Sequence, residues 1–303
     1  MKIVFMGTPI FATSILKRLI QDEYKVVGVI SQPDKKVGRK QILTPTPVSA
    51  CALENGIEVY QPISIKEGLD KIIKWNPDLI VTCAYGQMIP QSILTYPKLG
   101  SLNVHASLLP KLRGGAPIHK AIIYGEKETG ISVMRMVKQM DAGDYMLQEK
   151  IKIEEDDTMI SLHDKLMICG ADAISKSIPL LAEGKAEFIK QEESEATFAY
   201  NITKEEEYID ANRDVQIVYD HIRGLISWPV GHIVVLDKKI KIHQARLKSN
   251  ETKHAIGSLF VEDKNLFLQC QNGVIHLLDV QLEGKAKCSA LEFINGAGRK
   301  YIQ

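Results

Sequence analysis

The chain has 303 residues, of which 45% are hydrophobic and 25% are charged, a composition typical of one large or two ordinary globular domains. It contains no internal repeats and no low-complexity tracts, which excludes repeat architectures. Its net charge of +1 does not by itself indicate nucleic-acid binding. Residues 211–303 nevertheless hold 13 basic against 9 acidic residues, which is weak evidence for an anionic partner and is more typical of a solvated surface.

Short apolar runs alternate with helical patterns through residues 2–136. The apolar runs are continuous, as in strands that are buried on both faces of a parallel sheet. Two of the helical patterns end at Gly56 and Gly125. We therefore expect an α/β fold with a parallel sheet. The predicted strands are residues 2–6, 24–30, 57–60, 78–84, 101–105 and 131–136, and the predicted helices are residues 11–20, 48–56, 65–75 and 116–125.

The composition of the chain changes near residues 190–210. A long helix with 3.6-residue spacing is predicted over residues 158–184, and the polar, acidic stretch at residues 191–210 resembles a linker. A further helix is expected at residues 215–225. It is followed by five short strands with turns between them, which favour a small barrel. These strands are residues 232–237, 239–247, 257–262, 265–271 and 273–281.

Two polar residues stand at the end of the fifth predicted strand. Asn103 and His105 are two positions apart, so their side chains project to the same face. Ligands of open α/β sheets bind outside the carboxyl ends of the strands. Asp141 lies in a glycine-bearing turn after the sixth strand and can present a carboxylate at the same edge. An amide, an imidazole and a carboxylate suit carbonyl chemistry, although the Asn-His spacing alone also fits a hydrogen-bonded pair that closes the strand.

Other kinds of chemistry find less support in the sequence. The turn at Gly7 to Pro9 is not a dinucleotide-binding Gly-x-Gly-x-x-Gly, and Ser107 lacks the surroundings that activate a nucleophile. The five cysteines contain no Cys-x-x-Cys pair, which favours reduced thiols over a zinc site or disulfides. No segment approaches the length of a membrane span, and the first apolar run is too short for a secretion signal.

Basic residues concentrate in a long connection at residues 32–47. Prolines flank this segment, which is longer than most connections in a compact domain and is either functional or a solvated loop. A second basic pattern lies on the strand at 239–247, where lysines alternate with isoleucines, as they also do on a solvated edge strand. The basic residues of the two segments are Lys35, Lys36, Arg39, Lys40, Lys239 and Lys241.

Several stretches resemble one family, the methionyl-tRNA formyltransferases, over essentially the full length of the chain. The pattern Asn-x-His-x-Ser-Leu-Leu-Pro with a downstream Asp-x-Gly marks the wider group of transferases that use formyltetrahydrofolate. The basic loop and the C-terminal barrel narrow the resemblance to the tRNA enzymes. The matching stretches are residues 7–12, 32–40, 79–90, 103–118, 128–136, 140–144 and 227–229.

This resemblance implies a Rossmann-like catalytic domain at residues 1–189, a linker at 190–207 and an OB-like tRNA-binding domain at 208–303. It implies that the formyl group of 10-formyltetrahydrofolate, a co-substrate, moves to the amino group of methionyl initiator tRNA for translation initiation. Neither a metal ion nor a covalent enzyme intermediate is needed. We further expect a monomer in the bacterial cytoplasm.

The resemblance also implies roles for individual residues. Asn103, His105 and Asp141 are the expected catalytic set, in which Asn103 and a protonated His105 stabilise the developing oxyanion. Arg39 matches the arginine with which the family probes the acceptor end of tRNA, and Lys35, Lys36, Lys40, Lys239 and Lys241 are expected further tRNA contacts. The expected folate site comprises Ser107, Leu108, Leu109 and Pro110 with Gln87, Met88 and Ile89.

Three alternatives remain open from the sequence. An amino-sugar N-formyltransferase would share the Asn-His-Asp set but has no need of a basic loop at residues 35–40. A formyltetrahydrofolate hydrolase would use water as acceptor and would not require a nucleic-acid-binding barrel. A non-catalytic RNA-binding α/β protein would have no use for the three intact polar residues.

Overall fold

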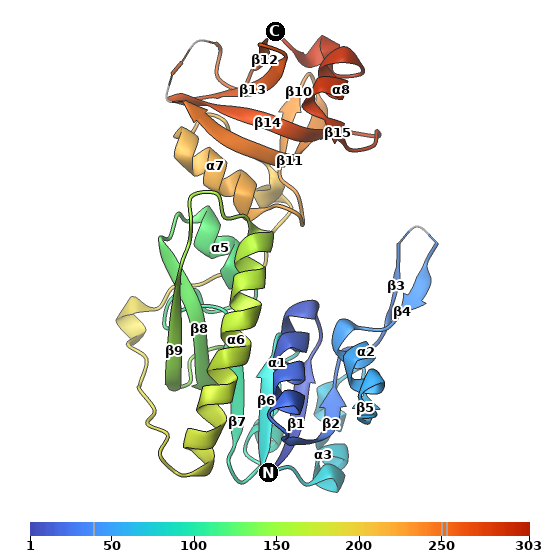
Figure 1. The fold of residues 1–303 in the computed structure, drawn as a ribbon, viewed down its shortest axis with the longest axis vertical. Coiled ribbons are helices and arrows are strands. Elements are labelled where there is room, and N and C mark those ends of the chain that lie inside the picture. Colours follow the sequence, from blue (N-terminus) through green and yellow to red (C-terminus); the bar gives the residue numbers. More distant parts are fainter. Residues whose placement is uncertain (39, 250, 253) are drawn as a thin grey trace. The chain divides into compact units, whose positions relative to one another are not determined.

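The computed structural model describes residues 1–38, 40–249, 251–252 and 254–303, and Figure 1 shows their fold. No helix in this described part is long and apolar enough to cross a membrane. The α-helices are α1 Ile10–Gln21, α2 Pro47–Glu54, α3 Leu69–Trp75, α4 Gln91–Leu94, α5 Pro117–Ile123, α6 Met159–Ala182, α7 Val215–Gly224 and α8 Ala290–Asn295. The strands are β1 Lys2–Gly7, β2 Lys25–Ile30, β3 Lys35–Val37, β4 Ile42–Thr44, β5 Val59–Tyr60, β6 Leu79–Cys83, β7 Ser101–His105, β8 Glu128–Arg135, β9 Tyr145–Lys152, β10 His232–Val235, β11 Lys238–Ser249, β12 Leu259–Glu262, β13 Asn265–Cys270, β14 Gly273–Leu282 and β15 Cys288–Ser289.

The chain divides into two compact units. The first unit comprises Met1–Pro117, Thr129–Ile151 and His163–Tyr200, and the second comprises Ile118–Glu128, Lys152–Leu162 and Asn201–Gln303. The backbone therefore passes between the units several times. The domain boundaries predicted from the sequence, with a linker at 190–207, stay a prediction.

The first unit contains a seven-stranded sheet with the order β5-β2-β1-β6-β7-β8-β9. The pairs that join β5, β2, β1, β6 and β7 are all parallel, which confirms the predicted α/β class. The sixth predicted strand, β8, pairs with β7 in the antiparallel direction. The sheet is therefore mixed, and the expectation of a wholly parallel sheet is corrected. β9, which carries charged residues and has only half-buried and exposed positions, was not predicted.

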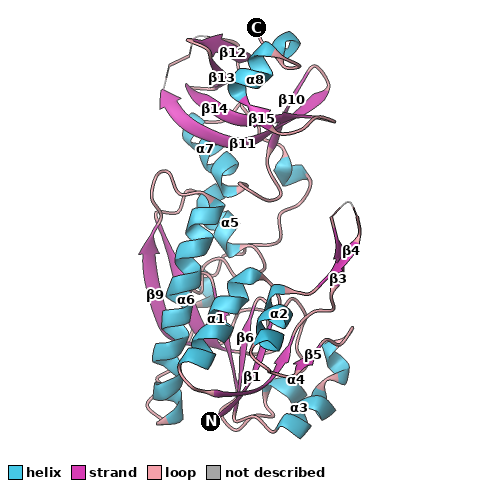
Figure 2. Cartoon of the chain, turned by 45° about the vertical axis from the view of Figure 1, so that its right-hand side comes forward, coloured by secondary structure: helices cyan, strands magenta, loops and turns pink. Residues whose placement is uncertain are grey.

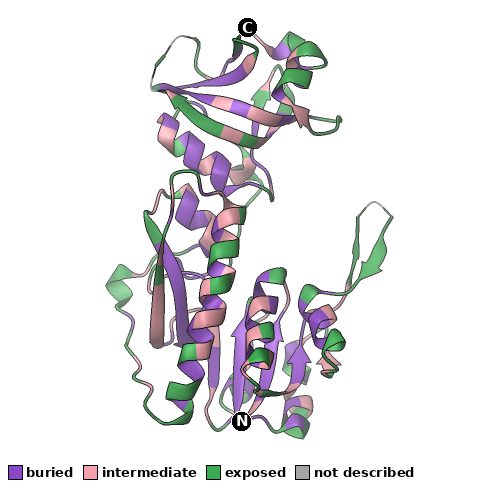
Figure 3. Cartoon of the chain, viewed as in Figure 1, coloured by how far each residue is buried: buried purple, intermediate pink, exposed green. Residues whose placement is uncertain are grey.

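The central strands of this sheet are buried on both faces. Val4 and Met6 of β1 pack in one cluster with Trp75 of α3, and Ile3 and Phe5 alternate with them toward the opposite face. All four β1 side chains are fully buried. Figure 2 shows the helices and strands of this unit, and Figure 3 shows the buried central strands. The rigid sheet holds the loops at its carboxyl edge, where the polar residues predicted from the sequence lie.

The long basic connection forms a β-hairpin in the structure. β3 and β4 pair with each other in an antiparallel two-stranded sheet, and Figure 1 shows them extending away from the rest of the first unit. Every described residue of the two strands is exposed, including the apolar side chains of Val37, Ile42 and Leu43. A two-stranded hairpin without a covered face has little stability of its own, which suits a segment that acts by contacting another molecule.

The second unit contains an antiparallel sheet with the order β10-β11-β14-β13-β12, and β15 also pairs with β14. The sequence predicted a small barrel, and these strands form a half-barrel. Its core includes Val218 and Ile222 of α7 together with Ile240, Ile242 and Phe293. The alternation of isoleucine and lysine on β11 is therefore explained by one buried and one more accessible face.

We expect the stability of the chain to fall on acidification, partly because of His221 in α7. Burial lowers the pKa of this imidazole, whose Nε2 contacts the Glu206 carbonyl oxygen at 2.8 Å. The folded state therefore binds fewer protons than the unfolded state below about pH 6.5, the ordinary histidine pKa, so stability is present above that pH and is lost as the pH falls. Between pH 7.5 and 5, the melting temperature of His221→Gln should fall less than the melting temperature of the parent. His243→Gln on β11 is the control, and identical slopes for His221→Gln and the parent would contradict this account.

Candidate functional site

Asn103 lies toward the carboxyl end of β7, and the oxygen of its side-chain amide already accepts a hydrogen bond. The Thr82 hydroxyl of β6 donates to Asn103 Oδ1 at 2.8 Å. Because β6 and β7 pair Thr82 directly with Asn103, the register of the sheet sets this contact. The bond to Oδ1 fixes the amide orientation and directs the NH₂ group of Asn103 to act as a donor.

His105 lies next to Asn103 on the same strand face and is 6% exposed. Its Nε2 contacts the carbonyl oxygen of Leu112 at 3.0 Å, so this nitrogen carries a proton and donates. Its Nδ1 lies 3.7 Å from Asp141 Oδ2, which is too long for a direct hydrogen bond. The carboxylate is close enough to stabilise positive charge on the ring when Nδ1 takes up a proton.

Asp141 reaches this site from the connection between β8 and β9. Since β8 is antiparallel to β7, the carboxylate does not come from a neighbouring parallel strand end, which corrects the route expected from the sequence. Asp141 has a positive φ of 50°, and its Oδ2 accepts a hydrogen bond from the Gly114 N–H at 2.9 Å. Only glycine fits at position 143 of this turn, because a Cβ there would lie 1.8 Å from the Arg135 carbonyl oxygen. The structure thus brings Asn103, His105 and Asp141 together.

The loop after β7 is fixed by hydrogen bonds that use its own polar groups. The Ser107 hydroxyl donates to the Lys111 carbonyl at 2.6 Å, which directs it away from a role as nucleophile. Ser132 donates to the Ser107 carbonyl at 2.6 Å and accepts from the Leu109 N–H at 3.0 Å. Ser107 and Leu109 are buried, whereas Leu108 and Pro110 are partly accessible. Within the predicted folate set, Leu108 and Pro110 can contact a ligand, and Ser107 and Leu109 shape the loop.

The second predicted folate segment follows β6. Met88 is 64% exposed, Ile89 belongs to the core, and Gln87 accepts from the Ile65 N–H at 2.9 Å. Hydrogen bonds also tie this loop to its neighbours, since the Tyr85 carbonyl accepts from the Thr8 hydroxyl at 2.9 Å. Hydrogen bonds therefore join the loops after β1 and β6, and β6 is the strand that pairs with β7 at Asn103. Met88 provides the accessible apolar surface of this segment.

The predicted tRNA contacts of the first unit lie on the exposed hairpin. Lys35 and Lys36 are on β3, and Lys40 is in the turn toward β4. Arg39, the residue with the most specific predicted role, lies outside the described residues. Lys35, Lys36 and Lys40 are all exposed, which is consistent with a segment available to an anionic partner.

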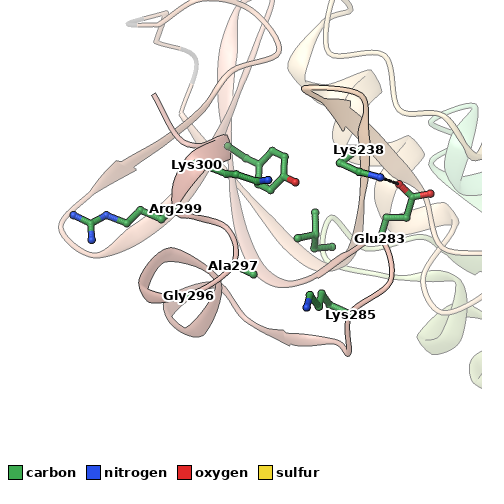
Figure 4. Close-up of a pocket in the computed structure, with 9 residues that line it drawn as sticks. Lys238, Glu283, Lys285, Gly296, Ala297, Arg299 and Lys300 are labelled. Carbon is green, nitrogen blue, oxygen red and sulfur yellow. Dashed lines mark ion pairs between the residues drawn. The ribbon is translucent and has the colours of Figure 1, made fainter.

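The predicted contacts of the second unit lie on β11. Lys239 is exposed, Lys241 is partly accessible, and both alternate with the buried Ile240 and Ile242. The structure also reveals a basic pocket of about 510 Å³ at the start of β11, shown in Figure 4, where an ion pair joins Lys238 to Glu283. The pocket's other basic residues are distant in sequence, which explains why no local pattern indicated them. They are Lys285, Arg299 and Lys300.

Two buried residues near the site had no sequence signal. Arg113 is fully buried and Gln191 is 4% exposed, and the two side chains hydrogen-bond to each other. The segment around Gln191 was predicted to begin a linker. In the structure this segment runs along the loop after β7. Arg113 N–H donates to the Thr197 carbonyl at 2.9 Å, and Ala199 N–H donates to the Arg113 carbonyl at 2.7 Å.

The cysteines are poorly suited to act as nucleophiles, and the described residues offer no favourable metal site. Burial raises the pKa of all five cysteine thiols, most strongly that of the fully buried Cys83, which disfavours a reactive thiolate. Within the described ranges, no cluster of three or more His, Cys, Asp or Glu side chains is placed to hold a metal ion.

Comparisons with known proteins match both units. The family model for formyl transferase matches residues 1–178, and that for the formyl transferase C-terminal domain matches residues 201–298. The methionyl-tRNA formyltransferase of Bacillus mycoides (strain KBAB4) is 47% identical over 300 residues, which cover 98% of this chain and 96% of the relative.

Solved structures show the same fold at lower identity. An N-formyltransferase from Helicobacter canadensis, in complex with folinic acid and dTDP-3-aminofucose, is 19% identical with a TM-score of 0.71, covering 91% of this chain and 98% of that one. A methionyl-tRNA formyltransferase from Clostridium thermocellum is 20% identical with a TM-score of 0.57, covering 82% and 94%. At these identities the two structures support the fold alone.

Proposed function

Because the chain belongs to the methionyl-tRNA formyltransferase family, we propose that it transfers the formyl group of 10-formyltetrahydrofolate to the amino group of methionyl initiator tRNA. The observation that carries this proposal is the convergence of Asn103, His105 and Asp141 at one edge of the sheet. All three residues match the family pattern, and a carbonyl transfer requires the donors and the carboxylate that they supply.

Asn103 is the oxyanion donor in this mechanism. The methionyl amine attacks the formyl carbon, a C–N bond forms, and the formyl oxygen gains negative charge. Thr82 donates to Asn103 Oδ1 and so fixes the amide, and a preorganised NH₂ donor stabilises the oxyanion without reorganisation. When the intermediate collapses, the bond from carbon to N10 of the folate breaks, and N10 takes up a proton.

His105 accepts the proton of the amine in this mechanism, and Asp141 stabilises the positive charge that results. The sequence interpretation placed His105 beside Asn103 as a second oxyanion donor. Its Nε2, however, is directed to the Leu112 carbonyl, so we assign His105 to proton transfer through Nδ1. Asp141 lies 3.7 Å from that nitrogen and stabilises the charged ring. The amine loses its proton to this pair as the C–N bond forms.

The donor binds beside this pair in the proposal. The accessible apolar side chains of Leu108, Pro110 and Met88 can pack on the folate, and Gln87 holds the segment that carries Met88 through its bonds to the Ile65 N–H and the Ile63 carbonyl. Ser107 and Leu109 act indirectly, by holding the loop after β7 in shape. Residues 1–189 serve as the catalytic domain and residues 208–303 as the tRNA-binding domain, joined at 190–207. A monomer in the cytoplasm of a bacterium, where charged tRNA is used, completes the proposal.

A formylation assay tests the proposed reaction. The purified chain is given 10-formyltetrahydrofolate with a labelled formyl group and either initiator or elongator methionyl-tRNA. We expect label on the methionyl amine of initiator tRNA and much less on elongator tRNA. Equal labelling of both tRNAs would contradict the assignment to initiation, and tetrahydrofolate release without labelled tRNA would contradict the acceptor.

Arg39→Ala is expected to raise KM or lower kcat for methionyl-tRNA and to leave folate binding unchanged. Arg39 stands in the sequence between β3 and β4, whose residues are exposed, and the family pattern assigns it to the acceptor end. Steady-state kinetics with each substrate varied in turn provide the measurement. Lys98→Ala, an exposed lysine that precedes β7, is the control. Parent-like formylation by Arg39→Ala would make the hairpin an inert surface segment.

Lys239→Ala and Lys241→Ala should weaken tRNA binding mainly through its electrostatic part. If each lysine neutralises one phosphate, the slope of log affinity against log salt should fall by about one unit per substitution. Binding of methionyl-tRNA measured between about 50 and 200 mM salt gives this slope. Lys264→Ala, at the turn between β12 and β13, is the control. An unchanged slope in both variants would remove β11 from the tRNA contacts.

A further inference from the structure

Gln191 is a buried amide that uses every one of its hydrogen-bonding positions. Its Oε1 accepts from Arg113 Nε at 3.0 Å and from Arg113 Nη2 at 2.8 Å. Its Nε2 donates to the Asp141 carbonyl at 2.8 Å and to the Gly143 carbonyl at 2.6 Å. One side chain therefore joins the turn that carries Asp141 to the loop that carries Arg113. Glutamine can do this because its amide has an acceptor and two donors at opposite corners.

The two residues that flank Arg113 contact the predicted catalytic pair. The Leu112 carbonyl accepts from His105 Nε2 at 3.0 Å, and the Gly114 N–H donates to Asp141 Oδ2 at 2.9 Å. These contacts join His105, residues 112–114, Gln191 and Asp141 in one network, and the 3.7 Å between His105 Nδ1 and Asp141 Oδ2 is the one step in it without a hydrogen bond. Two bonds hold Asp141 in place, one from Gly114 N–H to its carboxylate and one from Gln191 to its carbonyl.

Both ends of the Gln191 bridge are in positions that need support. Asp141 has a φ of 50°, a conformation that a residue with a Cβ adopts at some cost and that persists where its surroundings hold it. Arg113 is a fully buried cation, and besides Gln191 it is paired with Glu193, whose Oε1 lies 2.8 Å from Nη2. Glu193 itself is largely exposed, so the buried Arg113 guanidinium is held in one position by its bonds to Gln191 and Glu193 together.

We propose that Gln191 is a positioning residue for formyl transfer, which sets the Asp141 carboxylate against His105 Nδ1 by bridging the Asp141 turn to Arg113. This inference rests on the proposed function. The Gln191 amide bonds to Arg113 and to the Asp141 and Gly143 carbonyls, so it acts on Asp141 through the main chain. Its loss should lower kcat and leave substrate binding largely intact.

The test is the near-isosteric change Gln191→Glu. The carboxylate still accepts from Arg113, but it cannot donate to the Asp141 and Gly143 carbonyls. A displacement of a catalytic group by about 1 Å can cost about 100-fold, so we expect kcat to fall by about 10- to 100-fold with KM for both substrates changed less than about 3-fold. Gln139→Glu, an exposed residue two positions before Asp141, introduces the same charge and should keep parent kinetics.

A double-mutant cycle with Asp141→Asn separates positioning from general destabilisation. If Gln191 acts through Asp141, Gln191→Glu should lower kcat by less than about 3-fold once the carboxylate is gone. Additive losses in the cycle, a parent-like kcat for Gln191→Glu, or an equal loss in Gln139→Glu would overturn the proposal. If Gln191→Glu does not fold, Gln191→Met is judged by the same criteria. Failure of the parent itself to formylate methionyl-tRNA would contradict the proposed function instead, so the two outcomes are distinct.

Discussion

Asn103→Ala should lower kcat for formyl transfer by about 10²- to 10³-fold, the usual cost of removing one oxyanion donor. Folate affinity should change little, because the amide acts on charge that develops only in the transition state. The structure supports this role, since Thr82 occupies Asn103 Oδ1 and leaves the NH₂ group as the donor.

The measurement for Asn103 is single-turnover transfer at saturating donor and tRNA, alongside the dissociation constant for the folate. Asn103→Asp is the sharper variant, because it keeps the shape of the side chain, removes the donor and adds a negative charge. It should be at least as slow as Asn103→Ala. Thr82→Ser retains the hydroxyl that orients the amide and is the matched control. A kcat near the parent value in Asn103→Ala would remove Asn103 from the catalytic set.

His105→Ala should lower kcat by about 10²- to 10⁴-fold, the range for loss of a general acid or base. The two ring nitrogens have different partners, and only Nδ1 faces the Asp141 carboxylate. His105→Gln offers a more conservative test, because its amide can still donate to the Leu112 carbonyl but cannot shuttle a proton near neutral pH. It should keep folate binding and lose most of the turnover.

The companion experiment for His105 compares the effect of Asp141→Asn in the parent and in His105→Gln. If the carboxylate works through the imidazole, Asp141→Asn should cost much less when the imidazole is absent. Full turnover in His105→Gln would show that proton transfer does not pass through this ring. Equal costs of Asp141→Asn in both backgrounds would assign the carboxylate a separate task, such as positioning a water molecule.

The fold class and the catalytic strand follow from local patterns in the sequence. Continuous apolar runs predict β1 and β6, as in strands buried on both faces, whereas β7 alternates Leu102 and Val104 with polar residues. The direction of β8 is not readable in this way, since a strand that is buried on both faces has the same apolar content in either direction. β9 has no fully buried residue, and the strands of the β3–β4 hairpin are three residues each, so neither produces a clear period.

The candidate site is predictable where its residues are close in the chain. Asn103 and His105 are two positions apart on one strand, and the spacing alone places them on one face. The hydrogen bond from His105 Nε2 to the Leu112 carbonyl depends on the path of the loop after β7, and it is the reason that we propose proton transfer through Nδ1. Gln191 is 78 residues from Arg113 in the sequence, in a polar stretch with no periodicity, so only the structure reveals their contact.

The central claim is that this chain uses its Asn-His-Asp site to formylate methionyl-tRNA. The most direct measurement offers labelled 10-formyltetrahydrofolate together with initiator methionyl-tRNA, a nucleotide-linked amino sugar and water, and follows the label into each product. We predict that the label appears on the methionyl amine and that Asn103→Ala abolishes most of this transfer. Label on the amino sugar, or released as free formate, with none on the tRNA would contradict the account.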